Sequence, residues 1–428
     1  MISINNFKKL SFFVYGLGST GQSVVNFFKK NKIKKYQVWD DNNKILYKNK
    51  RPSNLYHALN SVNYIVLSPG VSLNKTINKK KLKKFEKKII TDIDLIFLIK
   101  KYYKTIVVTG TNGKSTTCKI ISHLLKQKKI KSLIGGNIGT PVLNLDTQKD
   151  HFLIIEASSF QLAHSKFICP DYAILLNITN DHLDWHGTMK NYIDSKFKIF
   201  QKQKQNQYSF VNNKLKSQFK KRKMKGKLIV PNLNNYKKLK SNIKNSYLSL
   251  DINNENMSFV YALSKALGIS KNSLINSLKT FKGLPHRYEI FLKSQNCIFI
   301  NDSKATTFQA TKFALENTKN IFWIVGGLPK KKDRFYLKKF RKNILKAYII
   351  GNNISFFKNQ LKNKVNFEVL KSLKRSVKKV IRDVKIFNKR NSAILFSPAA
   401  ASFDQFLNFE NRGEKFKFYS KFYARKLF

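Results

Sequence analysis

The glycine-rich segment TGTNGKST (109–116) has the residue types of a nucleotide phosphate site. It follows the strand-like run TIVVT and precedes a helix-like run, although Val108 stands where the full GxxxxGK[ST] pattern has its first glycine. Backbone amides of such a loop can hold phosphate oxygens, the Lys114 ammonium can contact the β- and γ-phosphates, and the Ser115 hydroxyl can bind Mg²⁺. The predicted phosphate-binding residues are Gly110, Thr111, Asn112, Gly113, Lys114, Ser115 and Thr116.

A second glycine-rich turn, GLGSTG (16–21), lies near the N-terminus between an expected strand and an expected helix. Asp40 ends the next expected strand, so the segment matches the GxGxxG dinucleotide pattern with an acid about 20 residues further on. Taken alone, the pattern fits a nicotinamide dinucleotide, another diphosphate-bearing nucleotide, or a tight turn without a ligand.

Residues that can bind a metal ion follow the phosphate loop. Glu156 stands at the end of an expected strand, and Asp181 and His182 lie in NITNDHLDWHG (177–187). Because a carboxylate and an imidazole fall in the section that carries the loop, we expect a metal or catalytic role for Glu156 and His182. Lys196, on the following expected helix, is interpreted from the residues alone as a surface lysine.

Two motifs in the last third carry groups suited to a nucleotide. Arg287 in HRYE (286–289) can clamp a transferring phosphoryl group, because a guanidinium fits phosphate oxygens as a fork. Asp302 and Lys304 in NDSKATT (301–307) follow an expected strand and can hold ribose and phosphate.

Two further loops lie closer to the C-terminus. GGLPKKKD (326–333) is a glycine-rich turn in which Lys330 can bind a carboxylate, although its lysine run also fits a solvated surface. SPAAASFDQFLNFENRG (397–413) combines small residues, which allow close approach of the backbone, with Ser402 near an expected helix start, where anions bind well.

Strand-like and helix-like segments alternate through most of the chain, which predicts an α/β protein with parallel sheets. Three domains are expected, 1–93, 94–283 and 284–428, the first and last Rossmann-like and the central one of the mononucleotide-binding type. The expected strands are 11–15, 36–39, 64–67, 105–109, 152–156, 172–177, 297–300, 321–325, 346–350 and 393–396.

The composition is strongly basic, with 83 Lys and Arg against 23 Asp and Glu and a formal net charge of +60. Such a charge fits a nucleic-acid or anionic-membrane binder. The lysines are scattered rather than gathered in one tail or stripe, so we interpret them as surface composition. No apolar run approaches the roughly 20 residues that span a bilayer. Three distant cysteines without a CxxC pair indicate neither a disulfide framework nor a zinc site, as in a reducing cytoplasm.

In this order the motifs closely resemble those of the Mur ligases, over almost the full length and most weakly at about 200–250 and 355–390. GTNGKST alone points only to a wider superfamily that includes folylpolyglutamate synthase. GLGSTG, GGNIGTP (135–141), EASSFQL (156–162), GLPHR, NDSKAT and the 397–413 stretch are more specific in combination. That last stretch favours the member that adds D-glutamate to UDP-N-acetylmuramoyl-L-alanine, and the DNPR signature of the diamino-acid-adding relatives is absent.

The resemblance implies a substrate site for the UDP-muramoyl compound in the first domain, so that GLGSTG serves a uridine nucleotide. The family's arginine two positions after the matching aspartate is Asn42 here, which implies rearranged uracil contacts. The implied substrate residues are Ser19, Thr20, Asp40, Ser68, Gly70, Asn137, Gln161 and His182, of which the last three face the muramoyl-alanine portion.

ATP is the implied nucleotide, held by the loop and by Asn256, Arg287, Asp302 and Lys304. Asn256 matches an adenine-facing position, although the HN of the family's HNxxN run reads Ile252-Asn253 here. Lys196, in SKFKIF, matches the family's carbamylated lysine, which reverses its interpretation as a surface residue. Two Mg²⁺ ions are implied, with Ser115, Glu156, His182 and carbamylated Lys196 as their protein ligands.

The resemblance also implies the reaction. ATP phosphorylates the L-alanyl carboxylate to an acyl phosphate, and the D-glutamate amine then attacks it, with Lys114, His182, Lys196 and Arg287 as catalytic residues. It further implies a cytoplasmic monomer in peptidoglycan precursor synthesis, without a specific nucleic-acid partner or membrane insertion. The implied D-glutamate residues are Thr306, Lys330, Ser402 and Phe409.

Three alternatives stand beside this prediction. A nicotinamide-dependent oxidoreductase would rest on GLGSTG and Asp40 alone and would leave the lysine-bearing loop without a function. A nucleic-acid-binding protein would rest on the net charge and would need a basic stripe. A sister ligase would use another amino acid, or folate as acceptor.

Overall fold

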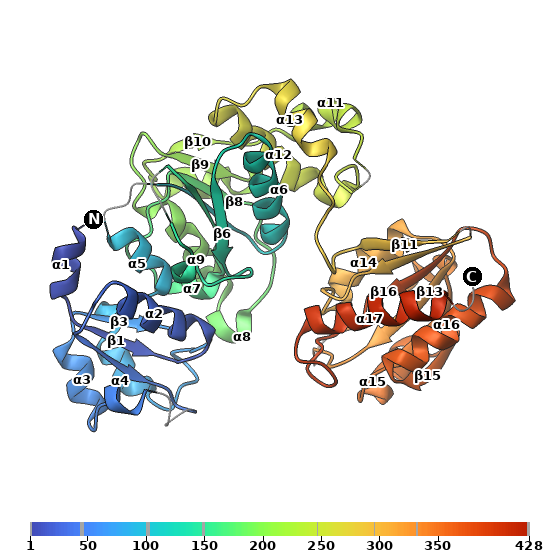
Figure 1. Ribbon diagram of the computed structural model, residues 1–428, viewed down its shortest axis with the longest axis horizontal. Coiled ribbons are helices and arrows are strands. Elements are labelled where there is room, and N and C mark those ends of the chain that lie inside the picture. The colour runs from blue at the N-terminus through green and yellow to red at the C-terminus, as the bar shows by residue number, and fades with distance from the viewer. Residues whose placement is uncertain are drawn as a thin grey trace. The chain divides into compact units, whose positions relative to one another are not determined.

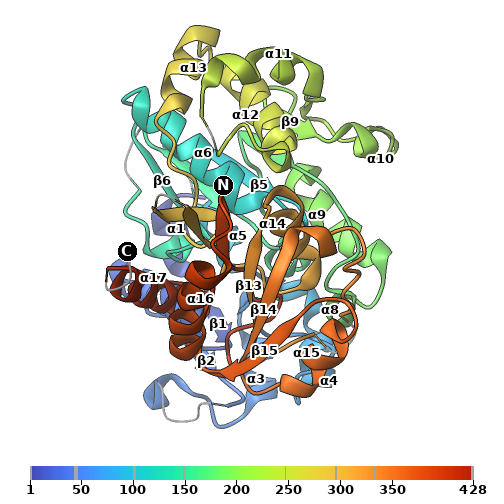
Figure 2. The ribbon, with the colours of Figure 1, turned by 90° about the vertical axis from the view of Figure 1, so that its right-hand side faces the viewer.

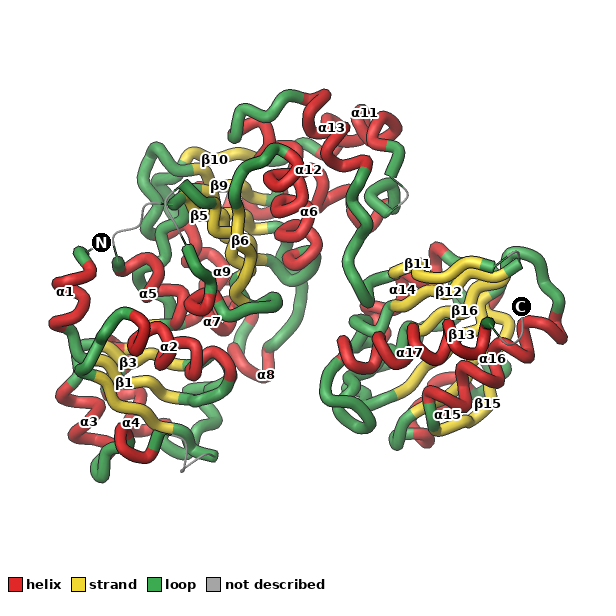
Figure 3. Tube along the Cα trace, in the orientation of Figure 1, coloured by secondary structure: helices red, strands yellow, loops and turns green. Residues whose placement is uncertain are grey.

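The computed structural model describes residues 2–42, 47–99, 103–147, 150–245, 247–294, 296–330 and 333–425. They form two compact units, residues 1–281 and 282–428 (Figures 1 and 3). Strands alternate with helices in both units, which confirms the predicted α/β class. The boundaries of the three expected domains stay predictions.

The first sheet is fully parallel and belongs to the N-terminal part of unit 1. Its strand β1 is buried on both faces, because Phe12 and Val14 pack into one core cluster while Phe13 and Tyr15 pack into another. The strand order is β2 (Tyr36–Trp39), β1 (Phe12–Tyr15), β3 (Tyr64–Leu67) and β4 (Ile89–Ile90), with helices α1 (Ile4–Lys9), α2 (Ser19–Lys30), α3 (Leu55–Ser61), α4 (Lys79–Lys84) and α5 (Asp92–Leu98).

The second sheet, also parallel, positions the phosphate loop. Helix α6 packs against β5, β6 and β7, and α9 packs on the opposite face (Figure 1). The strand order is β10 (Lys227–Ile229), β9 (Tyr208–Val211), β8 (Tyr172–Leu175), β5 (Lys104–Thr109), β7 (Phe152–Glu156) and β6 (Ser132–Gly136). The helices are α6 (Lys114–Gln127), α7 (Ser159–Ala163), α8 (Leu183–His186), α9 (Met189–Gln201), α10 (Lys216–Lys221), α11 (Leu233–Ile243), α12 (Asn254–Ala266) and α13 (Lys271–Lys279).

Unit 2 is built on a mixed sheet, because β11 is antiparallel to β12 while the other pairs are parallel. Alternate residues of the central strand β13 enter two core clusters, so helices α14 and α15 cover one face and α16 and α17 the other. The strand order is β11 (Glu289–Lys293), β12 (Cys297–Asn301), β16 (Ser392–Phe396), β13 (Ile321–Gly326), β14 (Ile344–Ile350) and β15 (Phe367–Lys371), and the helices are α14 (Phe308–Asn317), α15 (Ile354–Leu361), α16 (Leu373–Phe387) and α17 (Phe409–Ala424).

Helices of the described ranges are too short or too polar to cross a lipid bilayer. The parallel strands of all three sheets bring their carboxyl ends to one edge each. The turns that follow β1, β5, β7, β12, β13 and β16 carry most of the predicted site residues.

Candidate active site

The phosphate loop joins the end of β5 to the start of α6. Gly113 caps the helix with φ +83°, and a Cβ atom there would lie 2.1 Å from Oδ1 of Asn256. Only glycine meets both conditions without strain or displacement. Asn256, 5% exposed on α12, therefore lies directly against the loop, next to the helix N-terminus, whose N–H groups favour an anion.

Neighbouring segments hold the loop in place. The backbone N–H of Thr111 donates to the carbonyl oxygen of Asn177 at 2.9 Å, and that of Asn112 donates to Asn177 Oδ1 at 2.8 Å. The Thr111 hydroxyl lies 2.9 Å from the Tyr192 hydroxyl. Asn177 is itself fixed, because its amide donates to Glu255 at 2.8 Å. Contacts with Asn177 and Tyr192 thus position the loop.

Two lysine ammonium groups converge on one carbonyl oxygen of this loop. Lys114 Nζ donates to the carbonyl oxygens of Gly110, at 2.9 Å, and Thr111, at 2.8 Å. Lys196 Nζ reaches the same Gly110 oxygen at 2.8 Å. Two like charges so close repel each other, so the site favours an anion or a neutral lysine.

Lys196 is buried, with 1% of its surface exposed, so the interpretation from the residues alone as a surface lysine was wrong. Its ammonium lies 4.6 Å from the ring centroid of Tyr192. Burial holds the pKa of Lys196 well below its ordinary value, and the positive charge of Lys114 adds to this effect while Asp181 opposes it. Burial and the Lys114 charge thus shift the Lys196 equilibrium toward the neutral amine.

Glu156 lies at the end of β7, and only one of its two carboxylate oxygens accepts a hydrogen bond. Its Oε1 accepts from the Asn137 amide at 2.8 Å. Its Oε2 is buried without a hydrogen-bond partner among the described residues. A buried carboxylate oxygen without a donor is costly unless a cation satisfies it, so this atom fits a metal ion. Within the described ranges, no three His, Cys, Asp or Glu side chains gather as a metal cluster.

His182 lies beside the loop in the left-handed backbone region, with φ +54°. Its Nε2 is 3.3 Å from an Asp181 oxygen, and its side chain is 40% exposed. The ring packs edge-on against Phe160, at 4.7 Å between centroids. The predicted role of His182 in binding substrate and metal stays a prediction.

Gln161 has internal partners on both ends of its amide. Its Oε1 accepts from the backbone N–H and hydroxyl of Ser158 at 3.1 and 3.0 Å, and its Nε2 donates to Asp92 at 3.3 Å. Burial raises the pKa of Asp92 to about 6, while the Gln161 hydrogen bond opposes the shift. The predicted contact of Gln161 with substrate stays a prediction.

The GLGSTG turn is held by different means. A Cβ atom on Gly21 would lie 1.9 Å from the Gly16 carbonyl oxygen, so the helix start and the turn touch through glycine. Asp40 accepts from the Leu17 N–H at 2.6 Å, and Ser68 donates to the Gly16 oxygen at 2.7 Å. The predicted uridine-nucleotide residues Asp40 and Ser68 therefore shape the turn, while Ser19, Thr20 and Gly70 lie at its surface.

Asn42 stands where the family has an arginine, but another arginine, Arg51, lies close to this position. The Arg51 guanidinium is 3.7 Å from the ring centroid of Trp39 and donates to the Asp40 carbonyl oxygen at 3.2 Å. Asn42 donates its backbone N–H to Asp40 at 2.9 Å. No motif in the sequence pointed to Arg51.

In unit 2, the turns after β13 and β16 pair with each other. Leu328 and Ala401 exchange two backbone hydrogen bonds of 2.9 Å, and the Gly326 N–H donates to Pro398 at 3.0 Å. The two predicted D-glutamate segments, carrying Lys330 and Ser402, are thereby brought together. Ser402 is 2% exposed.

Residues predicted for ATP and for D-glutamate also meet in unit 2. Lys304 Nζ lies 3.5 Å from the ring centroid of Phe409, the first residue of α17. Asp302 accepts from the Ser397 hydroxyl at 2.7 Å. Burial raises the pKa of Asp302 to about 7, opposed by the Ser397 hydrogen bond and, more weakly, by the Arg287 charge. Thr306 is partly exposed nearby in the chain.

Comparison with known proteins identifies the relationship. The Mur ligase middle domain matches residues 108–267. A UDP-N-acetylmuramoylalanine--D-glutamate ligase of Wolbachia pipientis wMel is 33% identical, covering 97% of each chain. The ligase of the same name from Rickettsia felis is 34% identical, covering 99% of this chain and all of that one. The chain belongs to the Mur ligase family. The resemblance of its motifs is thereby confirmed, and the nicotinamide alternative is disfavoured.

Solved Mur ligases share the fold. The MurF ligase of Thermotoga maritima, in complex with ADP, has a TM-score of 0.58 at 15% identity and covers 98% of this chain. The UDP-N-acetylmuramate-alanine ligase MurC of the same organism has a TM-score of 0.52 at 15% identity and covers 97%. Both matches extend over all three sheets.

This Mur ligase also uses residues that the sequence analysis missed. Tyr192 contacts both Thr111 and Lys196, and Glu255 fixes Asn177 behind the loop. One signal was available, because Tyr192 precedes Lys196 by four residues and such a spacing puts both on one face of a helix. Glu255 had no comparable signal, since its partners are distant in sequence.

Proposed function

We propose that this Mur ligase joins D-glutamate to UDP-N-acetylmuramoyl-L-alanine and converts ATP to ADP and phosphate, in peptidoglycan precursor synthesis. The observation that carries the proposal is identity of 33 to 34% over nearly the whole length with ligases named for this reaction. Lys114 and Lys196 converge on the loop after β5, and Glu156 ends the neighbouring strand β7, which supports a site for phosphate and metal.

ATP would occupy the loop after β5. Lys114 would leave its two carbonyl partners and contact phosphate oxygens, while the α6 N-terminus supplies N–H groups. Asn256 would face the adenine. The unit 2 residues proposed to complete the nucleotide site are Arg287, Asp302 and Lys304.

Mg²⁺ bound here would neutralise phosphate charge during transfer. Glu156 Oε2 would be a direct ligand, and the Ser115 hydroxyl a second, because Mg²⁺ combines few protein oxygens with phosphate oxygens. His182 and carbamylated Lys196 would serve a second ion.

Carbamylation of Lys196 fits its surroundings. The neutral amine attacks CO₂, a nitrogen–carbon bond forms, and one proton is released to give a carbamate anion. Burial favours the required neutral amine. The product would face Lys114 with opposite charge, which removes the repulsion between the two ammonium groups.

The reaction would run in two steps. The γ-phosphoryl group passes to the L-alanyl carboxylate, with Lys114 and Arg287 offsetting the repulsion between two anions. The D-glutamate amine then attacks the acyl phosphate, and phosphate leaves with the bonding electrons. Thr306, Lys330, Ser402 and Phe409 would hold D-glutamate. The UDP substrate would lie against Ser19, Thr20, Asp40, Ser68, Gly70, Asn137, Gln161 and His182.

Phosphate release tests the assignment. The chain is incubated with ATP, Mg²⁺ and UDP-N-acetylmuramoyl-L-alanine, and D-glutamate is compared with L-glutamate, L-alanine and meso-diaminopimelate. Selective turnover with D-glutamate is expected. Turnover with another amino acid would instead identify a sister ligase. The proposed cytoplasmic monomer is checked by its mass in solution.

A further inference from the structure

The charged residues on the outer face of α16 in unit 2 are all cationic. Residues 373–390 hold eight Lys and Arg and one acid, Asp383. Asp383 is buried and accepts from Lys346 at 2.8 Å and Lys379 at 2.7 Å, so it does not offset the outer charges. The exposed residues of the helix include Lys374, Arg375, Lys378, Arg382 and Lys385.

Helix α17 adds exposed aromatic rings beside these cations. Phe418 is 61% exposed and Phe422 is 44% exposed, and their rings stack at 6.4 Å. Lys421 on the same helix and its C-cap residue Arg425 are also exposed. Figures 1 and 2 show α16 and α17 side by side on one face of the sheet. The aromatic rings and the cations thus belong to one surface.

Both helices end toward the side where the parallel strands begin. The Phe387 ring packs 5.4 Å from Phe322 near the start of β13, and Ala424 of α17 shares a core cluster with Val384 of α16. Ile386, 75% exposed, and Phe387, 50% exposed, therefore extend the apolar part of this surface. We call the outward residues of 374–387 and 415–425 the basic–aromatic face.

We propose that the basic–aromatic face docks this ligase on an anionic membrane surface. Lysine and arginine side chains would contact lipid head groups, while Phe418, Phe422 and Ile386 enter the boundary between head groups and acyl chains. The contact is peripheral and needs no spanning helix. It goes beyond the proposed ligase reaction and uses none of its residues.

The apolar residues favour a membrane over a nucleic acid. Single-stranded nucleic acids bind in charged grooves where bases stack on aromatic rings. Ile386 cannot stack on a base, and the basic–aromatic face is the outer surface of two adjacent helices. Exposed phenyl rings ringed by cations are typical of interfacial helices.

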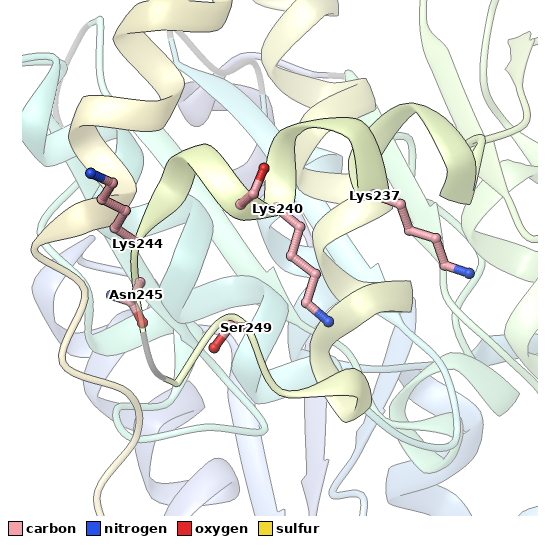
Figure 4. A pocket seen from close by; sticks show the side chains of 6 residues that line it. Lys237, Lys240, Lys244, Asn245 and Ser249 are labelled. Carbon is pink, nitrogen blue, oxygen red and sulfur yellow. The ribbon is translucent and has the colours of Figure 1, made fainter.

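A second lysine-rich surface in unit 1 serves as a matched control. Figure 4 shows a pocket lined by Lys237, Lys240 and Lys244 together with Ser241, Asn245 and Ser249. No aromatic side chain lines it, and Lys240 is bonded to Asp251 at 2.7 Å. It therefore offers positive charge without the apolar component.

The test uses the full chain and vesicles of phosphatidylcholine with or without one third phosphatidylglycerol, at 0.15 M salt. Binding to the anionic vesicles is expected, with at least about a tenfold drop in partition coefficient for K378E/R382E/K385E. The control K237E/K238E/K244E, which includes the exposed neighbour Lys238 of α11 in place of the ion-paired Lys240, makes the same charge change and should stay within about threefold of wild type. Equal losses in both variants, or no binding by wild type, would overturn the proposal.

The aromatic contribution is tested separately. F418S/F422S keeps every charge and should weaken vesicle binding several-fold, whereas a mere electrostatic contact would be unaffected and would overturn the insertion of the rings. Phe418→Trp should give a blue shift in emission on anionic vesicles only, after subtraction of wild-type emission. Tighter binding of the face to polyuridylate than to these vesicles would also contradict the proposal. Phosphate release by all variants should remain at the wild-type level.

Discussion

The two glycine-rich turns of unit 1 share a strand–turn–helix framework but differ in what they offer a ligand. In the first, Asp40 and Ser68 bind backbone groups of the turn itself. In the second, Lys114 and Lys196 converge on the Gly110 carbonyl. The first turn thus offers a ligand mainly its backbone groups. The second adds the charge of two lysine side chains, which suits phosphoryl transfer.

Removing the loop lysine should give the largest effect. Lys114→Ala is expected to lower kcat by at least about 10²-fold, because a group that stabilises the transition state is lost. Phosphate release with saturating substrates measures it. Lys119→Ala, an exposed lysine on the same helix, is the control and should change the rate less than about twofold. A near-wild-type rate for Lys114→Ala would show that the lysine of the second turn does not contribute to phosphoryl transfer.

Lys196→Ala should lower turnover by about 10²-fold through loss of a carbamate. Acetate or propionate is expected to restore part of the activity, because a small carboxylate can occupy the vacated space. Lys190→Ala, exposed on the same helix, should show neither loss nor rescue. Wild-type activity should also fall when CO₂ is removed and return when bicarbonate is added, as carbamylation requires. If neither the carboxylates nor bicarbonate restores activity, carbamylation is refuted.

Glu156→Gln should raise the Mg²⁺ concentration for half-maximal activity by at least about tenfold, since a charged ligand becomes a neutral amide. A magnesium titration of phosphate release gives the value. Glu86→Gln, at an exposed glutamate in the same unit, is the matched control. An unchanged magnesium requirement in Glu156→Gln would show that the buried Oε2 does not bind the metal.

A pair of glycine substitutions sharpens the contrast at the level of stability. Gly21→Ala meets a rigid carbonyl and should lower the free energy of unfolding by about 2–3 kcal/mol. Gly113→Ala meets the mobile end of Asn256 and a positive φ, and should cost about 1 kcal/mol while impairing nucleotide use. Urea denaturation compares the two. Equal stability losses would indicate that both turns are equally rigid.

The central strands could largely be predicted from the sequence, whereas five of the six edge strands of the described sheets could not, β2 being the edge strand that was predicted. All ten expected strands are present, while β4, β6, β10, β11 and β15 were missed, and these lie at sheet edges. Central strands of parallel sheets are covered on both faces and are continuously apolar, whereas edge strands are short, glycine-containing or half exposed. The sixth missed strand, β9, lies beside an edge.

The candidate site followed the same division. Glu156 was predicted because strand ends gather at one edge of a parallel sheet. The residues alone did not predict Lys196, which only the family resemblance singled out, since its burial depends on packing against Tyr192 and the loop, which are brought to it by tertiary structure. The basic–aromatic face was missed because its lysines form a stripe only at helical spacing.

The Lys114 ammonium donates to two carbonyl oxygens of its own turn. An incoming molecule must compensate for both lost hydrogen bonds before it gains from the ammonium. Phosphate oxygens can do so, whereas adenosine offers none at that position. The turn therefore selects ligands by their phosphate groups. A nucleoside without phosphates would bind poorly even if its base fitted the site.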